Sequence, residues 1–144
     1  MFKKLKTETI QAFLDEARYL DSKPQETHNM NSWKCGTTSC AVGDMAARGV
    51  CNLKISGGTL YYLNGMNWDA VIDAFDITQK EARFLFGGEF YLEKRSGEIP
   101  QQTANRIRKY LYYRMRKAEI LADYEKARRT GDIGICQQYA LALV

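Results

Sequence analysis

The chain has 144 residues, of which 45% are apolar and 26% charged, and its 21 Lys and Arg residues stand against 17 Asp and Glu. This composition is typical of one globular domain with a modest core and excludes a long disordered protein. No apolar run approaches the roughly 18 residues that a membrane span needs, so we expect no integral membrane protein. The net charge of +4 by itself points to neither nucleic acid nor a membrane surface.

The beginning of the chain argues against export. Lys3, Lys4 and Lys6 supply the charge of a signal peptide, but polar residues at 7–9 occupy the place of its apolar stretch. We therefore expect a cytoplasmic protein. In a reducing cytoplasm its cysteines are expected as free thiols that pack in the core. They are Cys35, Cys40, Cys51 and Cys136.

The first predicted element is a helix that Thr7 caps. Apolar residues recur from Ile10 to Leu20 at steps of three and four, the spacing of one helix face. Charged residues, Glu16 among them, are expected on the outward face. Residues 21–36 show neither the apolar spacing of a helix nor the alternation of a strand, and they are rich in turn formers, so they predict an ordered loop.

A second helix is expected from Thr37 or Thr38, either of which can cap it, to Gly49, which can adopt the left-handed conformation of a helix end. Apolar residues alternate with polar ones at 51–55, a glycine-containing turn follows, and residues 60–63 can pair back, which predicts a β-hairpin. Two strands alone are marginally stable in water, so the hairpin must lie across helices.

Two short helices follow the hairpin, and Trp68 and Phe75 line the first of them. The second opens at Thr78, with Glu81 three residues later, which is the pattern of a capping box. Residues 100–129 contain no glycine and keep their apolar positions on one face, so they predict one long helix or two nearly continuous ones.

Gly131 and Asp132 end the long helix, and residues 133–143 predict a terminal helix that folds back. The expected fold is mainly α, with about six helices and one small β-hairpin in a single compact domain over residues 1–144. Within it, residues 1–99 hold the shorter helices, the hairpin and the cysteine-containing loop. Residues 100–144 hold the long basic helix and the terminal helix.

A distinctive motif covers the loop and the start of the second helix. It reads Met30-x-x-Trp33-x-Cys35-Gly36-Thr37-x-x-Cys40-x-x-Gly43. This pattern resembles that of a family of small, largely uncharacterised proteins from phages, prophages and bacteria. Residues 75–86 are similar to the family's second block, as is Thr103 in the long helix. The resemblance implies a phage or prophage origin and a cytoplasmic setting, that of the host cell if the protein is phage-encoded. This chain has Asp44 where the family often carries an aromatic residue or His.

The motif also contains the candidates for covalent chemistry. Cys40 is expected in the first turn of the second helix, where unpaired amides and the helix dipole lower the pKa of a thiol. His28, the only histidine, can fold back as its base, with Asp44 or Asn31 as the orienting group. One alternative function is therefore a Cys-dependent hydrolase or transferase that uses Cys40 or Cys35 with His28. Buried structural thiols are the simpler interpretation, and we assign no catalytic residue.

Metal binding is a further alternative, because His28, Cys35, Cys40 and Cys51 are the right types of ligand. Their spacing lacks the close Cys-x-x-Cys pair that gives structural zinc sites their geometry. We therefore expect neither a metal nor another cofactor. The motif is instead expected to pin the long loop in place, with Met30 and Trp33 as its anchors.

The strongest local signal is charge on the long helix, where six Lys and Arg and no acid fall within residues 106–117. On a helical wheel the cations alternate with tyrosines, a surface that can clamp an acidic protein face or neutralise phosphates and stack bases. The expected binding residues are Arg106, Tyr110, Tyr113, Arg116 and Lys117. Arg114 falls among apolar neighbours instead. Either it meets an acid, for which Asp73, Asp76 and Glu81 are the candidates, or the helix breaks near Tyr112 and Tyr113.

Together these features favour a phage-type cytoplasmic protein that binds a macromolecular partner without turnover. The expected partner is a protein of the host or of the phage, and counter-defence and host takeover are the candidate roles. A nucleic-acid-binding protein that uses the basic helix 106–117 is the second alternative, beside the Cys-dependent enzyme. A membrane is not expected as a partner. The sequence leaves the oligomeric state open.

Overall fold

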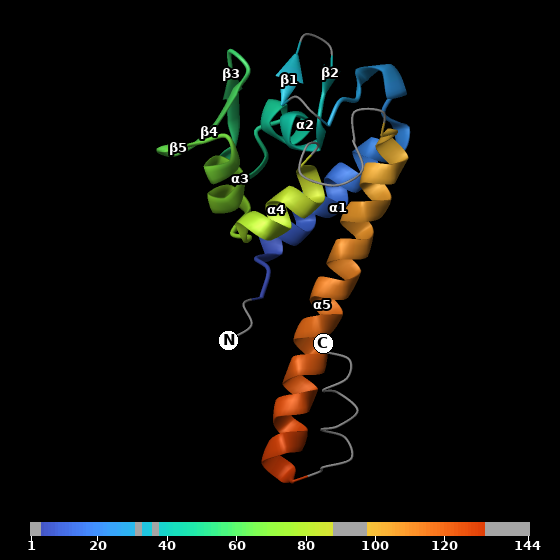
Figure 1. Ribbon diagram of the computed structural model, residues 1–144, viewed down its shortest axis with the longest axis vertical. Helices are drawn as coiled ribbons and strands as arrows, with labels where there is room; N and C mark the ends of the chain where they lie inside the picture. Colours follow the sequence, from blue (N-terminus) through green and yellow to red (C-terminus); the bar gives the residue numbers. More distant parts are fainter. Residues whose placement is uncertain (1–3, 31–32, 36–37, 88–97, 132–144) are drawn as a thin grey trace.

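The computed structural model describes residues 4–30, 33–35, 38–87 and 98–131, and its architecture is mainly α, as the sequence predicts (Figure 1). The α-helices are α1 (Thr7–Ser22), α2 (Ala41–Ala47), α3 (Trp68–Phe75), α4 (Gln79–Phe86) and α5 (Pro100–Thr130). Two single 3-10 turns are η1 (Gln25–Thr27) and η2 (Val50–Asn52). The strands are β1 (Lys34–Cys35), β2 (Thr38–Ser39), β3 (Lys54–Ser56), β4 (Thr59–Tyr62) and β5 (Gly65–Met66).

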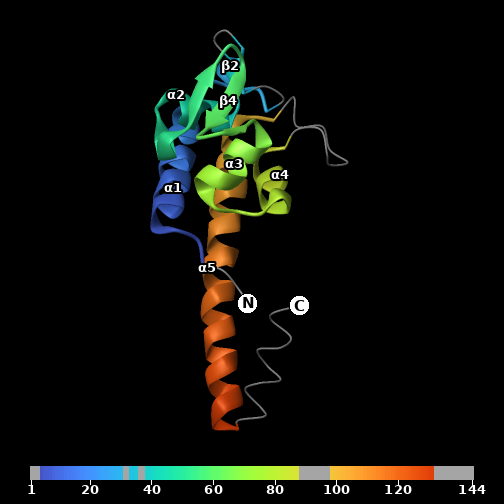
Figure 2. The same cartoon turned by 90° about the vertical axis from the view of Figure 1, so that its left-hand side faces the viewer.

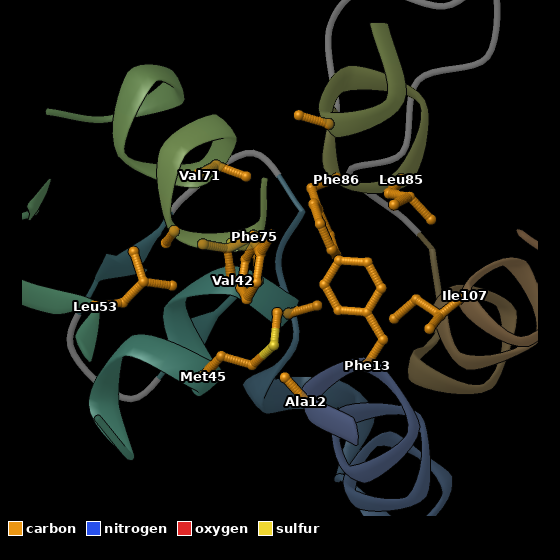
Figure 3. Close-up of a cluster of buried hydrophobic side chains, with 14 of the residues drawn as sticks. Ala12, Phe13, Val42, Met45, Leu53, Val71, Phe75, Leu85, Phe86 and Ile107 are labelled. Carbon is orange, nitrogen blue, oxygen red and sulfur yellow. The ribbon is translucent and has the colours of Figure 1, made fainter. Parts of the chain in front are cut away.

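The core lies where α1 packs against the first half of α5, and α2, α3 and α4 cover the same region. Phe13 of α1 is at its centre, with its ring edge-on to Phe75 at 4.9 Å and to Phe86 at 5.6 Å between centroids (Figure 3). Such edge-to-face contacts add to the stability that burial of the rings provides. The second half of α5 extends beyond the other described helices and strands (Figures 1 and 2).

The ends of the helices largely follow their local sequence signals. Thr78 and Glu81 form the predicted capping box at the start of α4. Gly49 and Gly131 adopt left-handed φ angles of 71° and 77° after α2 and α5; the sequence predicts this conformation for Gly49 and a helix end at Gly131. At the start of α1 the N-cap is Lys6 and no side chain caps the helix, so the predicted cap at Thr7 is wrong by one residue.

The start of the second helix differs from the prediction. Thr38 and Ser39 form β2, which pairs antiparallel with β1 through the registers Lys34 to Ser39 and Cys35 to Thr38. A helix capped by Thr37 or Thr38 would need helical backbone at Ser39, which is extended in β2. The helix α2 therefore starts at Ala41, and Cys40 takes the capping position that the sequence assigns to a threonine.

The predicted hairpin is present as part of a three-stranded antiparallel sheet in the order β3-β4-β5. Ile55 faces Leu60 across the first pair of strands, and Tyr61 faces Met66 across the second. The first strand starts later than predicted, because Cys51 and Asn52 have φ angles of 52° and 60°, which an extended strand excludes.

The long helix is confirmed, since α5 begins at Pro100 and ends at Thr130. The predicted terminal helix at 133–143, with Cys136, lies outside the described residues. Among the residues that the structure describes, no helix combines the length and the apolar character that a membrane span requires.

Candidate functional site

Cys40 does not have the environment of a catalytic thiol. Its Sγ accepts a hydrogen bond from the Gly43 amide at 3.4 Å, as the side-chain cap of α2. The residue is only 1% exposed, and burial outweighs that hydrogen bond and raises the pKa of the thiol to about 12. This corrects the expectation of a lowered pKa at a helix start. A thiol that stays protonated inside the core is a poor nucleophile.

His28 is buried and engages both of its ring nitrogens. Nδ1 lies 3.1 Å from Lys23 Nζ, and Nε2 lies 3.0 Å from Thr103 Oγ1. Because Thr103 donates its own hydrogen to Glu98, Nε2 carries the ring proton and Nδ1 accepts from Lys23. Burial and the charge of Lys23 lower the pKa of His28 to about 4, so the ring is neutral at pH 7. With both nitrogens occupied, His28 is not placed to act as a base for a thiol.

Lys23 is the centre of a group that we call the buried polar cluster. Its members are Lys23, His28, Ser39, Asp44 and Thr103. Lys23 Nζ lies 2.9 and 3.1 Å from the two carboxylate oxygens of Asp44 and 2.7 Å from the Ser39 carbonyl oxygen. Together with His28, these acceptors use all the ammonium hydrogens. The cluster thereby ties the end of α1 to β2 and α2, and through Thr103 to α5. Asp44 serves Lys23 and does not orient a catalytic histidine.

Glu16 extends this region and corrects the expectation of an outward side chain. It is fully buried, and Arg48 Nη2 donates to its Oε2 at 2.6 Å. Burial is the main cause that raises the pKa of Glu16 to about 9, and the neighbouring Asp44 raises it further. The side chain is therefore a neutral acid at pH 7.

Sequence reasoning did not find Lys23, Glu16 or Thr103 as members of one polar region. A signal for part of it exists. Asp44 stands in the apolar and small-residue stretch 41–46, where an acid has to be buried and needs a cation. Glu16 follows Phe13 by three residues and precedes Leu20 by four, so its position falls on the apolar face of α1.

The cysteine-containing motif holds the loop against α2 and α3. A Cβ atom at Gly43 would lie 1.5 Å from the Trp33 carbonyl oxygen, so only glycine allows α2 to pack this closely on the loop. The Trp33 ring lies edge-on to Trp68 at 5.0 Å, and its Nε1 donates to the Asn67 side chain at 3.1 Å. Met30 is buried. These contacts hold the loop in place on α2 and α3, which is the structural role expected for the motif.

Asn31, Gly36 and Thr37 lie outside the described residues, as does the side chain of Cys35. Within the described part of the chain, no three His, Cys, Asp or Glu side chains come together as metal ligands.

Part of the predicted binding surface on α5 is taken up by contacts within the protein. Arg106 pairs with Glu98 at 2.8 Å and donates to the Leu85 carbonyl oxygen at 3.1 Å, so its guanidinium fastens α5 to the end of α4. Arg108 pairs with Asp21. These two cations of the basic stretch therefore already have carboxylate partners.

Arg114 meets an acid, as predicted, and the acid is Glu81. Its Nε donates to Glu81 Oε2 at 3.0 Å, and the Tyr110 hydroxyl donates to the same oxygen. Burial raises the pKa of Glu81, but hydrogen bonds from Tyr110, the Thr78 amide and Arg114 outweigh it and hold the pKa below its ordinary value. Burial and this carboxylate raise the pKa of Tyr110. The side chains of Tyr110 and Arg114 are thus fixed by a charged hydrogen-bond acceptor.

Beyond this point the surface of α5 becomes open and aromatic. Tyr113 is 60% exposed, and Phe84 of the neighbouring α4 is 42% exposed. Arg116 lies over the Tyr112 ring at 5.3 Å. Between α4 and α5 runs a groove of about 380 Å³, which we call the aromatic–basic groove. Its lining residues are Phe84, Lys109, Tyr110, Tyr113, Arg114 and Lys117.

Of the predicted binding residues, the structure brings Tyr110, Tyr113 and Lys117 together in this groove, leaves Arg116 beside it and directs Arg106 to Glu98. Phe84 and Lys109 were not predicted. Phe84 was not predicted because the apolar pattern of its helix assigns the inward positions to residues 85 and 86 and says nothing of residue 84.

Comparisons of the chain with protein-family models, with curated proteins and with solved structures gave no match.

Proposed function

We propose that the protein acts by binding a protein partner through the aromatic–basic groove and the adjoining face of α5. The observation that carries this proposal is the groove itself, where exposed aromatic rings and lysines meet between two helices. Aromatic residues are enriched at protein interfaces because they bury a large area at a small cost in conformational entropy.

The charges on α5 favour a protein over a nucleic acid. Arg106, Arg108 and Arg114 pair with Glu98, Asp21 and Glu81, so the charges of these three arginines are balanced within the protein. A surface that follows a phosphate backbone gains its affinity from cations that displace counterions, and a cation with a carboxylate already bound contributes less.

The interior of the protein supports binding without turnover. The candidate thiol Cys40 is buried and protonated, and the candidate base His28 is held between Lys23 and Thr103. A phage origin and a target in host defence or takeover belong to the same proposal, and their support is the sequence resemblance alone.

Affinity capture from bacterial lysate, with and without nuclease treatment, tests the proposal. The test variant is Lys109→Glu with Lys117→Glu, which reverses two charges of the groove. Its matched control is Lys4→Glu with Lys54→Glu, the same change in net charge at two exposed positions elsewhere. Arg106 is left unchanged, because its replacement would break the contacts with Glu98 and Leu85.

We expect the wild type and the control pair to capture a protein that survives nuclease, and the groove pair to lose it while its melting temperature stays within a few degrees of the wild type. Capture that the groove pair retains would contradict the proposal. Capture that nuclease abolishes would instead favour a nucleic-acid partner.

A further inference from the structure

The floor of the aromatic–basic groove is held by hydrogen bonds to Glu81, which also balances the charge of Arg114. Tyr110 is half-buried, its ring lies 6.4 Å from that of the core residue Phe13, and its hydroxyl is held by Glu81. Arg114 also lines the groove, and Glu81 balances its charge at 3.0 Å. A site whose middle is aromatic and electrically balanced favours an apolar group there and disfavours a phosphate or a carboxylate.

The two lysines that line the groove lie about two helical turns apart on α5. Lys109, Tyr113 and Lys117 follow one another at four-residue steps, so they form a row along one face of α5. At a rise of about 1.5 Å per residue, the two lysines are separated by roughly 12 Å along the helix axis, with Tyr113 between them. An extended peptide advances about 3.3 Å per residue, so this separation corresponds to roughly four residues of a bound strand.

The volume limits what can enter. A groove of about 380 Å³ is near the lower end of the range of about 300–1,000 Å³ seen for ligand sites. It has room for one large side chain between Phe84 and Tyr113. Aromatic and aliphatic anchors of this kind carry most of the binding energy when they fill such a site.

From this arrangement we propose that the groove binds an acidic peptide segment of its partner. One large apolar side chain of the segment enters between Phe84 and Tyr113, and carboxylates about two residues to either side of it face Lys109 and Lys117. This inference rests on the proposed function and names the chemistry of its partner.

The test is selection of peptides from a displayed library of random 12-residue sequences on the immobilised full-length protein. Fluorescence anisotropy then measures the affinity of the selected peptides for the wild type, for the Lys109→Glu and Lys117→Glu pair, for the control pair at Lys4 and Lys54, and for Tyr113→Ala. Tyr113 is more than half exposed, so its truncation removes no core contact. Melting temperatures confirm that each variant is folded.

The expected peptides carry one large apolar residue between acidic residues. Their affinity should fall at least about tenfold in the groove pair and in Tyr113→Ala, stay within about twofold in the control pair, and weaken as the salt concentration rises.

Three results would overturn the inference. Selected peptides that bind in the groove without acidic flanks would remove it and leave the proposed function standing, since the groove would still be a protein-binding site. Failure to select any peptide whose binding depends on the groove would also remove it, and the lysate capture would then decide the proposed function separately. Displacement of the peptides by a single-stranded oligonucleotide of higher affinity would assign the groove to nucleic acid.

Discussion

Replacement of Lys23 by Met tests whether one cation holds the buried polar cluster together. Methionine matches the length of lysine but leaves the Asp44 carboxylate buried without its cation, and the side chains of the pair are 1% and 4% exposed. Loss of one partner of a buried ion pair costs about 3–5 kcal/mol. That is a large part of the roughly 5–15 kcal/mol by which a domain is stable.

The assay is urea unfolding at pH 7, followed by the fluorescence of the two tryptophans. The matched control is Arg108→Met, which breaks the ion pair with Asp21 where the two side chains are 41% and 46% exposed. An exposed pair contributes about 0–1 kcal/mol, so the control should be nearly as stable as the wild type.

A double variant separates the orphaned charge from other effects of the substitution. Asp44→Asn combined with Lys23→Met removes the uncompensated carboxylate, so we expect it to recover at least about 1 kcal/mol relative to Lys23→Met alone. The reasoning is refuted if Lys23→Met costs no more than Arg108→Met, or if the two substitutions at the cluster destabilise additively.

Three further measurements test the interior. Gly43→Ala should lower the free energy of unfolding by at least about 1–3 kcal/mol, because its Cβ would lie 1.5 Å from the Trp33 carbonyl oxygen. The control Gly65→Ala, whose Cβ would have its nearest neighbours at 3.4–3.5 Å, should lower it less. Equal losses in urea unfolding would contradict this. The folded protein keeps the proton of Glu16 up to a pKa of about 9, against an ordinary value of 4.5. Below pH 6.5 the lowered pKa of His28 has the opposite effect, but from pH 6.5 to about 9 stability should fall as pH rises, by up to about 1.4 kcal/mol per unit. Glu16→Gln should flatten that slope between pH 6.5 and 9, and an unchanged slope would assign it to another group. Iodoacetamide should label Cys40 of the folded protein far more slowly than free cysteine, as mass spectrometry of labelled peptides can measure; rapid labelling would revive the catalytic thiol.

The parts of the fold that sequence could predict depend on interactions between near neighbours. The capping box of Thr78 and Glu81 involves residues three apart, and Gly131 ends α5 by its own backbone conformation. The need of Arg114 for an acid also follows from the wheel of its own helix, and Glu81 was among the candidates. In each case the decisive information lies within one helix.

The buried polar cluster could not be predicted in this way. Lys23 contacts Asp44 across 21 residues, and His28 contacts Thr103 across 75. A charged residue on an apolar face is equally compatible with an exposed position and with a buried one whose partner comes from elsewhere. For the same reason Cys40 was expected to have a lowered pKa, since the helix start is visible in the sequence while the burial that outweighs it is not.

The groove likewise combines features that the sequence predicts with contacts between distant segments that it does not. The alternation of cations and tyrosines on α5 is visible in the sequence, but which cations face carboxylates of other segments is not. Arg106 and Arg108 are paired by Glu98 and Asp21, and Phe84 enters the groove from a different helix.

Glu81 has consequences for how this surface can change over evolutionary time. Its Oε1 accepts the Thr78 amide that begins α4, while its Oε2 accepts from Arg114 and Tyr110 under the groove. Aspartate is too short to reach both sides, and glutamine would lose the charge, so almost any substitution would loosen a helix start and a binding floor together. Divergence in partner choice is therefore easiest at Lys109 and Tyr113, whose exposed side chains line the groove beside this hydrogen-bond network.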